Sequence, residues 1–142
     1  MDMKGQLIIP GCYVSLETIR DFYSQAARDA GLDEESIFEV QVAVDEASSN
    51  IIDHAYGGEG LGDIVCSFEI LPRGLKVELH DHGNPFDPDK IDAPDIISDP
   101  IKRKDRGLGV FFMRQMMDEV SFSFSDHGGN ILTMVKYREK RT

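Results

Sequence analysis

The sequence contains no tryptophan, only two cysteines and too few basic residues to balance its acidic ones. Cys12 and Cys66 lie far apart and form neither a metal-binding spacing nor a disulfide framework. The 15 lysines and arginines against 26 acidic residues give a formal charge of −11, which argues against direct nucleic-acid binding. No apolar run approaches the roughly 18 residues of a membrane span, and the N-terminus lacks a signal-peptide core. These absences favour a protein of the reducing cytoplasm.

The 142 residues suffice for one hydrophobic core, and we expect a single domain over residues 1–142. Apolar periodicity predicts the helices, and alternation bounded by turn residues predicts the strands. The expected elements are a strand (6–10), two helices (16–30 and 34–56), a hairpin (63–71 and 75–80), a helix (108–117) and a second hairpin (119–125 and 131–137, joined by a turn at 126–130). Ser15 and Gly31 are suited to cap and end the first helix. This order predicts an α+β fold: a two-layer α/β sandwich with one mixed, mostly antiparallel sheet and helices on one face.

The segment between the first hairpin and the third helix, residues 88–106, is rich in proline and aspartate and ends in a basic cluster. A loop of this length is uncommon in a small domain and is usually a functional lid or a disordered segment. The charged residues 138–142 are expected to form a solvated tail.

The helix around residues 40–58 combines an apolar stripe with a polar one. Glu46, Asn50, Asp53 and His54 fall on one face of an α-helix at spacings of four, seven and eight residues. The amide oxygen of Asn50 suits a hard cation such as Mg²⁺, and Glu46 is placed to act as a base. A solvated, locally paired helix face is the alternative explanation, and a histidine on such a face is more often structural than a ligand.

Two further segments carry polar groups or glycines at the ends of predicted elements. Asp81 ends a strand and is followed at once by Gly83, so a flat ring with an amino group has an acceptor and room beside the backbone; a simple turn is the alternative. Residues 106–109 (RGLG) open a helix, where free N–H groups favour phosphate. Taken alone, such a glycine pair is equally consistent with a flexible connection.

The order of these three segments resembles the nucleotide pocket of the GHKL ATPase superfamily, and more closely that of the small bacterial anti-sigma factor serine/threonine-protein kinases. EASSNIIDHAY resembles the N box of the family, DHGNPFD its G1 box and RGLG its G2 box. The resemblance extends from about residue 8 to residue 137. It implies the GHKL (Bergerat) type of sandwich, a histidine kinase-like ATPase domain that binds ATP or ADP with Mg²⁺ and has its lid at about residues 88–106.

The resemblance also implies roles for individual residues. Glu46 would be the catalytic base acting on an acceptor hydroxyl or on water, Asn50 the Mg²⁺ ligand, and Asp81 the acceptor for the adenine amino group. The other expected nucleotide-binding residues are Gly83, Phe86, Arg106, Gly107, Leu108, Gly109 and Thr133. Lys102 or Lys104 would compensate phosphate charge from the lid, while Asp53 and His54 have only supporting or structural roles.

As a function, the resemblance implies a cytoplasmic serine/threonine kinase. It would phosphorylate a STAS-type anti-sigma-factor antagonist and sequester a sigma factor, as a homodimer. The alternatives are a nucleotide-binding partner-switch module without kinase activity and a plain α+β domain that binds no nucleotide. A complete sensor histidine kinase is excluded, because none of the four histidines lies in a phosphoacceptor helix.

Overall fold

The computed structural model describes residues 3–85, 106–125 and 129–139, and the side chains of residues 106–108 and 125 are not part of that description. The elements in chain order are β1 (Lys4–Pro10), the 3₁₀ turn η1 (Tyr13–Ser15), α1 (Leu16–Asp29), α2 (Glu34–Asn50), the π-helical turn η2 (Ile51–Ala55), β2 (Asp63–Leu71), β3 (Gly74–Asp81), α3 (Arg106–Met116), β4 (Glu119–Ser125) and β5 (Gly129–Tyr137). None of the described helices is both long enough and apolar enough to cross a membrane.

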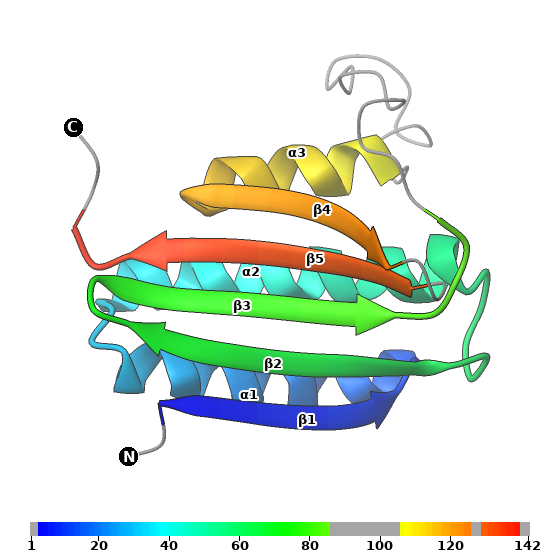
Figure 1. Ribbon diagram of the computed structural model, residues 1–142, viewed down its shortest axis with the longest axis horizontal. Coiled ribbons are helices and arrows are strands. Elements are labelled where there is room, and N and C mark those ends of the chain that lie inside the picture. Colours follow the sequence, from blue (N-terminus) through cyan, green and yellow to red (C-terminus); the bar gives the residue numbers. More distant parts are fainter. Residues whose placement is uncertain (1–2, 86–105, 126–128, 140–142) are drawn as a thin grey trace.

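The five strands form one sheet in the order β1-β2-β3-β5-β4. The three helices lie on one face of this sheet, with α2 packed between α1 and α3 (Figure 1). The predicted two-layer α+β sandwich is therefore confirmed. All four pairings between the described strands are antiparallel, so the sheet is not mixed, as had been expected, but wholly antiparallel in this part of the chain.

Alternation along β3 places the core and also one candidate site residue. Leu75, Val77 and Leu79 are fully buried against the helices, while the residues between them are half-buried on the open face. Asp81 is the next residue of the buried series, so its carboxylate lies on the helix-covered face where the strand ends. It is 3% exposed and pairs in register with Asn130 of β5.

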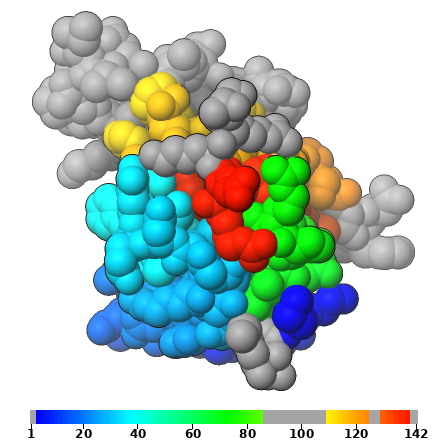
Figure 2. Space-filling model, turned by 90° about the vertical axis from the view of Figure 1, so that its left-hand side faces the viewer, coloured from blue at the N-terminus to red at the C-terminus, as the bar shows by residue number. Residues whose placement is uncertain are grey.

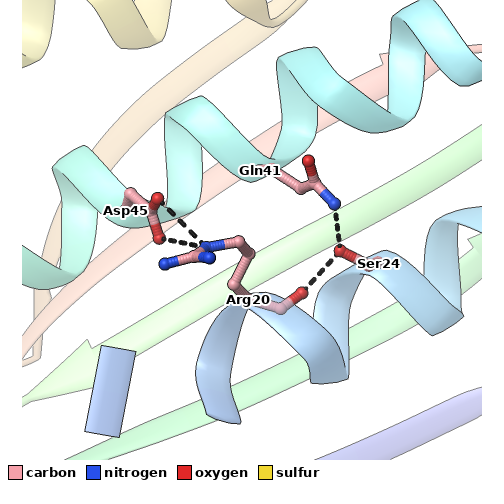
Figure 3. A network of polar contacts seen from close by, with 4 residues as sticks. All are labelled: Arg20, Ser24, Gln41 and Asp45. Carbon is pink, nitrogen blue, oxygen red and sulfur yellow. Dashed lines mark hydrogen bonds and ion pairs between the residues drawn. The ribbon is translucent and has the colours of Figure 1, made fainter. Parts of the chain in front are cut away.

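Polar contacts fix α1 against α2 (Figure 3). Arg20 Nε lies 3.2 Å from an oxygen of Asp45, and the Gln41 amide donates to Ser24 Oγ over 2.9 Å. These two contacts sit about one helical turn apart and set the rotation of α2 relative to α1. That rotation matters for the site, because α2 carries both Glu46 and Asn50.

The ends of the two long helices agree only partly with the sequence prediction. Gly31, with φ of +82°, ends α1 as expected, and Asp33 caps α2 by accepting from the Ser36 N–H over 2.8 Å. The prediction that Ser15 caps α1 was wrong, because its side chain makes no capping hydrogen bond. The turn η1 precedes the helix and holds Ser15 in a helical conformation, which is not the extended geometry of a cap.

The predicted helix 34–56 changes its winding at residue 51. There α2 gives way to η2, in which the Tyr56 N–H donates to the carbonyl of Ile51, five residues earlier. A π turn advances each residue by a smaller angle than an α turn. The expected single face of four polar groups was therefore wrong beyond Asn50. Asp53 is exposed and accepts from the Tyr13 hydroxyl, away from Asn50.

The end of β5 (Figure 2, red) lies between the hairpin of β2 and β3 (green) and the helical layer (cyan). The main-chain N–H of Arg138 donates to the carbonyl of Arg73 over 2.8 Å. Its guanidinium donates to the carbonyls of Ala30 and Pro72. Arg138, in the tail expected to be solvated, is exposed, and it also joins β5 to the β2–β3 turn and to the end of α1.

Candidate nucleotide-binding site

A narrow, mostly apolar pocket lies where β3 ends and β5 begins, under α2, η2 and α3. Its lining residues are Ala47, Asn50, Ile51, Ala55, Asp81, Met113, Phe122, Ser123, Phe124, Asn130, Ile131 and Leu132. The cavity volume is about 30 Å³, above the roughly 10–15 Å³ that one water molecule needs but far too small for a purine ring. A purine ring therefore enters only if side chains around the opening, such as the half-exposed Phe124, move aside.

Asp81 supplies a carboxylate to this apolar pocket. Its Oδ1 atom accepts two hydrogen bonds of 2.8 Å, from the Gly83 N–H and from the Asn130 side-chain amide. Within the described part of the chain, Oδ2 accepts none. An acceptor oxygen at the wall of an apolar pocket favours a ligand that brings an N–H group.

The backbone beside Asp81 lies against η2. A Cβ atom at Gly83 would lie 2.4 Å from the carbonyl oxygen of Ala55, so only glycine fits without moving the main chain. The Tyr56 hydroxyl accepts from the His82 N–H over 3.0 Å and donates to the carbonyl of Asp63 over 2.6 Å. The turn that follows β3 is thus held from two sides.

Glu46 and Asn50 meet the start of α3. A Cβ atom at Gly109 would lie 2.8 Å from Asn50 Nδ2 and 3.3 Å from Glu46 Oε2. The first turn of α3 therefore packs directly onto both side chains, and Gly107 lies in the same turn. Free N–H groups at a helix start attract anions, so phosphate, an amide oxygen and a carboxylate can meet at this point.

The environment of Glu46 favours its protonated form. Partial burial is the main cause that raises the pKa of its carboxyl group, and the neighbouring charge of Asp45 raises the pKa further. A carboxylate with a raised pKa is a stronger base once it has lost its proton. The effect suits a group that accepts a proton from a hydroxyl.

The donors at this point fit Mg²⁺ better than a metal held entirely by protein. No cluster of three or more imidazole, thiolate or carboxylate groups occurs among the described residues. Mg²⁺ commonly takes one or two protein oxygens and completes its octahedron with phosphates and water. The Asn50 carboxamide, one turn from Glu46 and against the start of α3, meets that requirement.

The structure brings together some of the predicted residues and separates others. Asn50 and Asp81 line one pocket, and Gly83, Gly109 and Glu46 lie against its walls. Thr133 is not part of it: it faces the open side of the sheet, opposite Glu78 and Ser121, and lines a different hollow. Five other residues that were expected to bind nucleotide lie outside the description in whole or in part. Phe86, Lys102 and Lys104 are not described at all, and the side chains of Arg106 and Leu108 are not described.

Asn130 and Phe122 are pocket residues that sequence reasoning missed. Asn130 falls in the predicted turn 126–130, but it is already part of β5 and is opposite Phe124 of β4. The only signal in the sequence is an amide directly after two glycines. Phe122 belongs to the alternating series of β4, which correctly predicts that it faces the helices but not that it lines a cavity.

The fold and the pocket together define a class of α+β nucleotide-binding domains, and comparison with known proteins identifies the family. Residues 10–136 match the family described as the histidine kinase-like ATPase domain. This match covers most of the sequence, so the chain belongs to that family.

Two curated proteins that are similar to this chain are serine-protein kinases. The serine-protein kinase RsbW of Listeria monocytogenes is 33% identical over 129 residues, covering 88% of this chain and 80% of the relative. The serine-protein kinase RsbW of Halalkalibacterium halodurans is 30% identical over 139 residues, covering 95% of this chain and 83% of the relative. The predicted resemblance to anti-sigma-type serine kinases is confirmed by these relatives, and the prediction of a serine/threonine kinase agrees with their names.

A solved structure supports the fold independently. The crystal structure of the RsbU and RsbW domains of Rv1364c from Mycobacterium tuberculosis superposes with a TM-score of 0.64. The match covers 94% of this chain and 32% of that one, at 14% identity. At this identity the likeness is one of fold, which the α+β sandwich described above shares.

Proposed function

We propose that this chain is a serine/threonine protein kinase that transfers the γ-phosphoryl group of ATP to a serine of a small anti-sigma-factor antagonist of the STAS type. The observation that carries the proposal is the meeting of Glu46 and Asn50 with the start of α3 beside the Asp81 pocket. The names of the relatives, serine-protein kinases, support the choice of reaction.

In this proposal the nucleotide spans two parts of the site. The adenine ring enters the apolar pocket, with its amino group donating to Asp81 Oδ2 and its edge beside Gly83. The phosphates lie at the first turn of α3, where the main-chain N–H groups of Gly107 and Gly109 donate to them. The amide oxygen of Asn50 would hold Mg²⁺, which neutralises phosphate charge when bound.

Glu46 is the proposed catalytic residue. The hydroxyl oxygen of the acceptor serine attacks the γ-phosphorus, and the bond from that phosphorus to the β,γ-bridging oxygen breaks, so that ADP leaves. The serine proton passes to Glu46. Because little covalent chemistry is required of the protein in phosphoryl transfer, catalysis rests on this alignment and on charge stabilisation around the phosphates.

The partners and the setting are proposed on the family resemblance. The chain would act in the cytoplasm as a homodimer. It would sequester a sigma factor, so that this factor could not take part in transcription. Its formal charge of −11 is compatible with a basic partner. Phosphorylation of the antagonist would then decide which of the two proteins is bound.

The test is transfer of radiolabelled γ-phosphate from ATP to the cognate antagonist, with Glu46→Gln as the matched variant. We expect the wild type to label the antagonist and the variant to be slower by about 10² to 10⁴, the usual contribution of a positioned base. Both should bind Mg·ADP. If both bind nucleotide but neither labels the antagonist, the chain is a nucleotide-dependent partner switch and not a kinase.

Thermal denaturation with Mg·ADP separates that result from the absence of any nucleotide site. A ligand at about 100 times its Kd stabilises the native state by about 2.7 kcal/mol. We expect a clear rise in Tm for the wild type and for Glu46→Gln. A Tm that does not change at high Mg·ADP would contradict both nucleotide-binding functions.

A further inference from the structure

We propose that Tyr56 is a positioning residue that makes the nucleotide affinity of the site depend on the end of the glycine-rich loop 57–62. The link runs from Gly62, through the ring and the hydroxyl of Tyr56, to the turn after β3 that carries Gly83. The inference rests on the proposed function, because it assumes that the nucleotide binds beside this turn. Tyr56 does not line the pocket, so it acts on the nucleotide only through the main chain.

The Tyr56 hydroxyl takes the place of a main-chain pair between β2 and β3. The pairing of these strands ends at Val65 and His80. The same register brings Asp63 opposite His82. There the hydroxyl donates to the carbonyl of Asp63 over 2.6 Å and accepts from the His82 N–H over 3.0 Å. Burial raises the pKa of this hydroxyl above its usual value, so it keeps the proton that it donates. The position of the turn after β3 therefore depends on the Tyr56 side chain.

The ring of Tyr56 lies against the main chain at the end of the loop. A Cβ atom at Gly62 would lie 2.4 Å from Tyr56 Cε1, and one at Gly11 would lie 3.5 Å from Cδ2. The Gly11 N–H donates to the carbonyl of Gly62 over 2.8 Å, and the Gly60 N–H donates to the carbonyl of Gly11 over 3.1 Å. The loop, the residue after β1 and the ring thus pack together, and a shift at Gly62 moves the ring.

Gly62 offers a way to displace Tyr56 without touching the pocket. Its φ is not in the left-handed region, so alanine strains no backbone there, and the nearest atoms to an added Cβ all belong to Tyr56. Gly5 makes the same kind of contact at the opposite end of the β1–β2 pair, where a Cβ atom would lie 2.4 Å from Phe68 Cε1. The φ of Gly5 is not left-handed either. Alanine at these two glycines therefore distinguishes displacement of Tyr56 from general loosening of the sheet.

The experiment measures the Kd of Mg·ADP by calorimetric titration, and Tm, for the wild type, Tyr56→Phe, Gly62→Ala and the double variant. We expect each single variant to bind ADP about threefold to tenfold more weakly, the range for one lost hydrogen bond. In the double variant the two effects should not add, because Gly62→Ala acts through the hydroxyl that Tyr56→Phe has already removed. The kcat of phosphoryl transfer at saturating ATP should not change, since neither variant moves Glu46 or Asn50.

Two control variants lie outside this link. Gly5→Ala should lower Tm about as much as Gly62→Ala does, but leave the Kd of Mg·ADP unchanged. Tyr23→Phe removes a buried hydroxyl that donates to the carbonyl of Glu78, also on β3, over 2.6 Å. It should likewise lower Tm without changing the Kd.

An unchanged Kd in Tyr56→Phe, or full additivity in the double variant, would overturn the inference while leaving nucleotide binding intact. Because Tyr56→Phe keeps the ring and removes only an oxygen, it decides the question even if Gly62→Ala does not fold. The inference also fails if Gly5→Ala weakens ADP binding as much as Gly62→Ala does. A wild type that binds no nucleotide would instead overturn the proposed function.

Discussion

Gly109 faces the side-chain amide of Asn50 so closely that a Cβ atom at Gly109 would lie 2.8 Å from Asn50 Nδ2. This approach joins α2 to the start of α3 at the point where the proposed phosphate site lies. The atoms in the way belong to the ends of two side chains, Asn50 and Glu46, and not to backbone. An added methyl group therefore moves functional groups without breaking the fold.

The first prediction is that Gly109→Ala weakens Mg·ATP binding about tenfold or more, while Tm changes by only a few degrees. Alanine suits a helix better than glycine, which offsets part of the steric cost. Calorimetric titration and thermal denaturation measure the two effects. In an Asn50→Ala background the same change should have little further effect, because the displaced amide is already gone. Full additivity in this double-mutant cycle would show that the methyl group acts elsewhere.

The second prediction concerns pH and the stability effect of Glu46. Its pKa is raised above the usual glutamate value of 4.5, mainly by burial. The native state therefore binds this proton more tightly than the unfolded state does. The protonated carboxyl group adds to the free energy of unfolding at low pH. This contribution is lost as the pH rises through the pKa of Glu46 in the unfolded state and then through its pKa in the native state. Glutamine carries no such charge. We expect Glu46→Gln to have a higher Tm than the wild type near pH 7, and the difference to shrink below about pH 4.

Measuring both proteins in the same buffers cancels the titration of the other carboxylates. Asp29→Asn on α1 is a suitable control, because Asp29 lies at the last turn of α1, outside the pocket. A Tm difference between Glu46→Gln and the wild type that stays constant across this range would mean that the carboxylate is solvated in the native state.

Most of the architecture follows from short-range patterns. The alternation of Val120, Phe122 and Phe124 predicts β4 with the bounds it has, and Gly31 correctly marks the end of α1. The family resemblance, carried by three short segments, correctly predicts the sandwich and brings Asn50 and Asp81 to one pocket. These are features that a sequence expresses in the spacing of neighbouring residues.

The features that could not be predicted depend on contacts between distant residues. The π turn that moves Asp53 away from Asn50 adds one residue to a helical turn, which the apolar pattern does not record. Asn130 meets Asp81 across 49 positions, and only the register of β3 and β5 brings them together. The same register places Thr133 on the open face, because successive strand residues point to opposite sides.

The third prediction links α1 to Glu46, the proposed catalytic base. Arg20 pairs with Asp45, the residue whose charge contributes to the raised pKa of Glu46 (Figure 3). Removing the guanidinium in Arg20→Gln leaves the charge of Asp45 unbalanced. We expect the acidic limb of the pH–rate profile for phosphoryl transfer to move to higher pH, with a stability loss of less than about 1 kcal/mol, since both side chains are more than a third exposed.

Ser24→Ala is the matched control for this effect. It removes the hydrogen bond from Gln41, which joins the same two helices, without changing any charge. Its pH–rate profile should coincide with that of the wild type. If Ser24→Ala moves the acidic limb as much as Arg20→Gln does, the cause is the position of α2 and not the charge of Asp45.

The fourth prediction concerns the other end of α3. Lys136 is 7% exposed, and its ammonium group donates to the carbonyl of Met116 over 2.6 Å and lies 3.2 Å from Glu39 Oε1 on α2. The contact with Glu39 is an ion pair without hydrogen-bond geometry, so Glu39 Oε1 depends on this one charge. Lys136→Met leaves the buried Oε1 atom of the partly exposed Glu39 carboxylate and a helix-end carbonyl unpaired. We expect a loss of about 3 kcal/mol in the free energy of unfolding, measured by urea denaturation.

Two further variants distinguish burial of charge from simple loss of an ion pair. Lys76→Met, in the neighbouring strand β3, removes two ion pairs with Glu69 and Glu78 that are about one third exposed, and should cost less than about 1 kcal/mol. Glu39→Met combined with Lys136→Met removes both charges of the ion pair and should recover much of the lost stability, because an apolar pair needs no compensating partner. If the double variant is as unstable as Lys136→Met alone, the loss of stability comes from the uncapped end of α3. The hydrogen bond of Lys136 to the Met116 carbonyl would then be more important than its ion pair with Glu39.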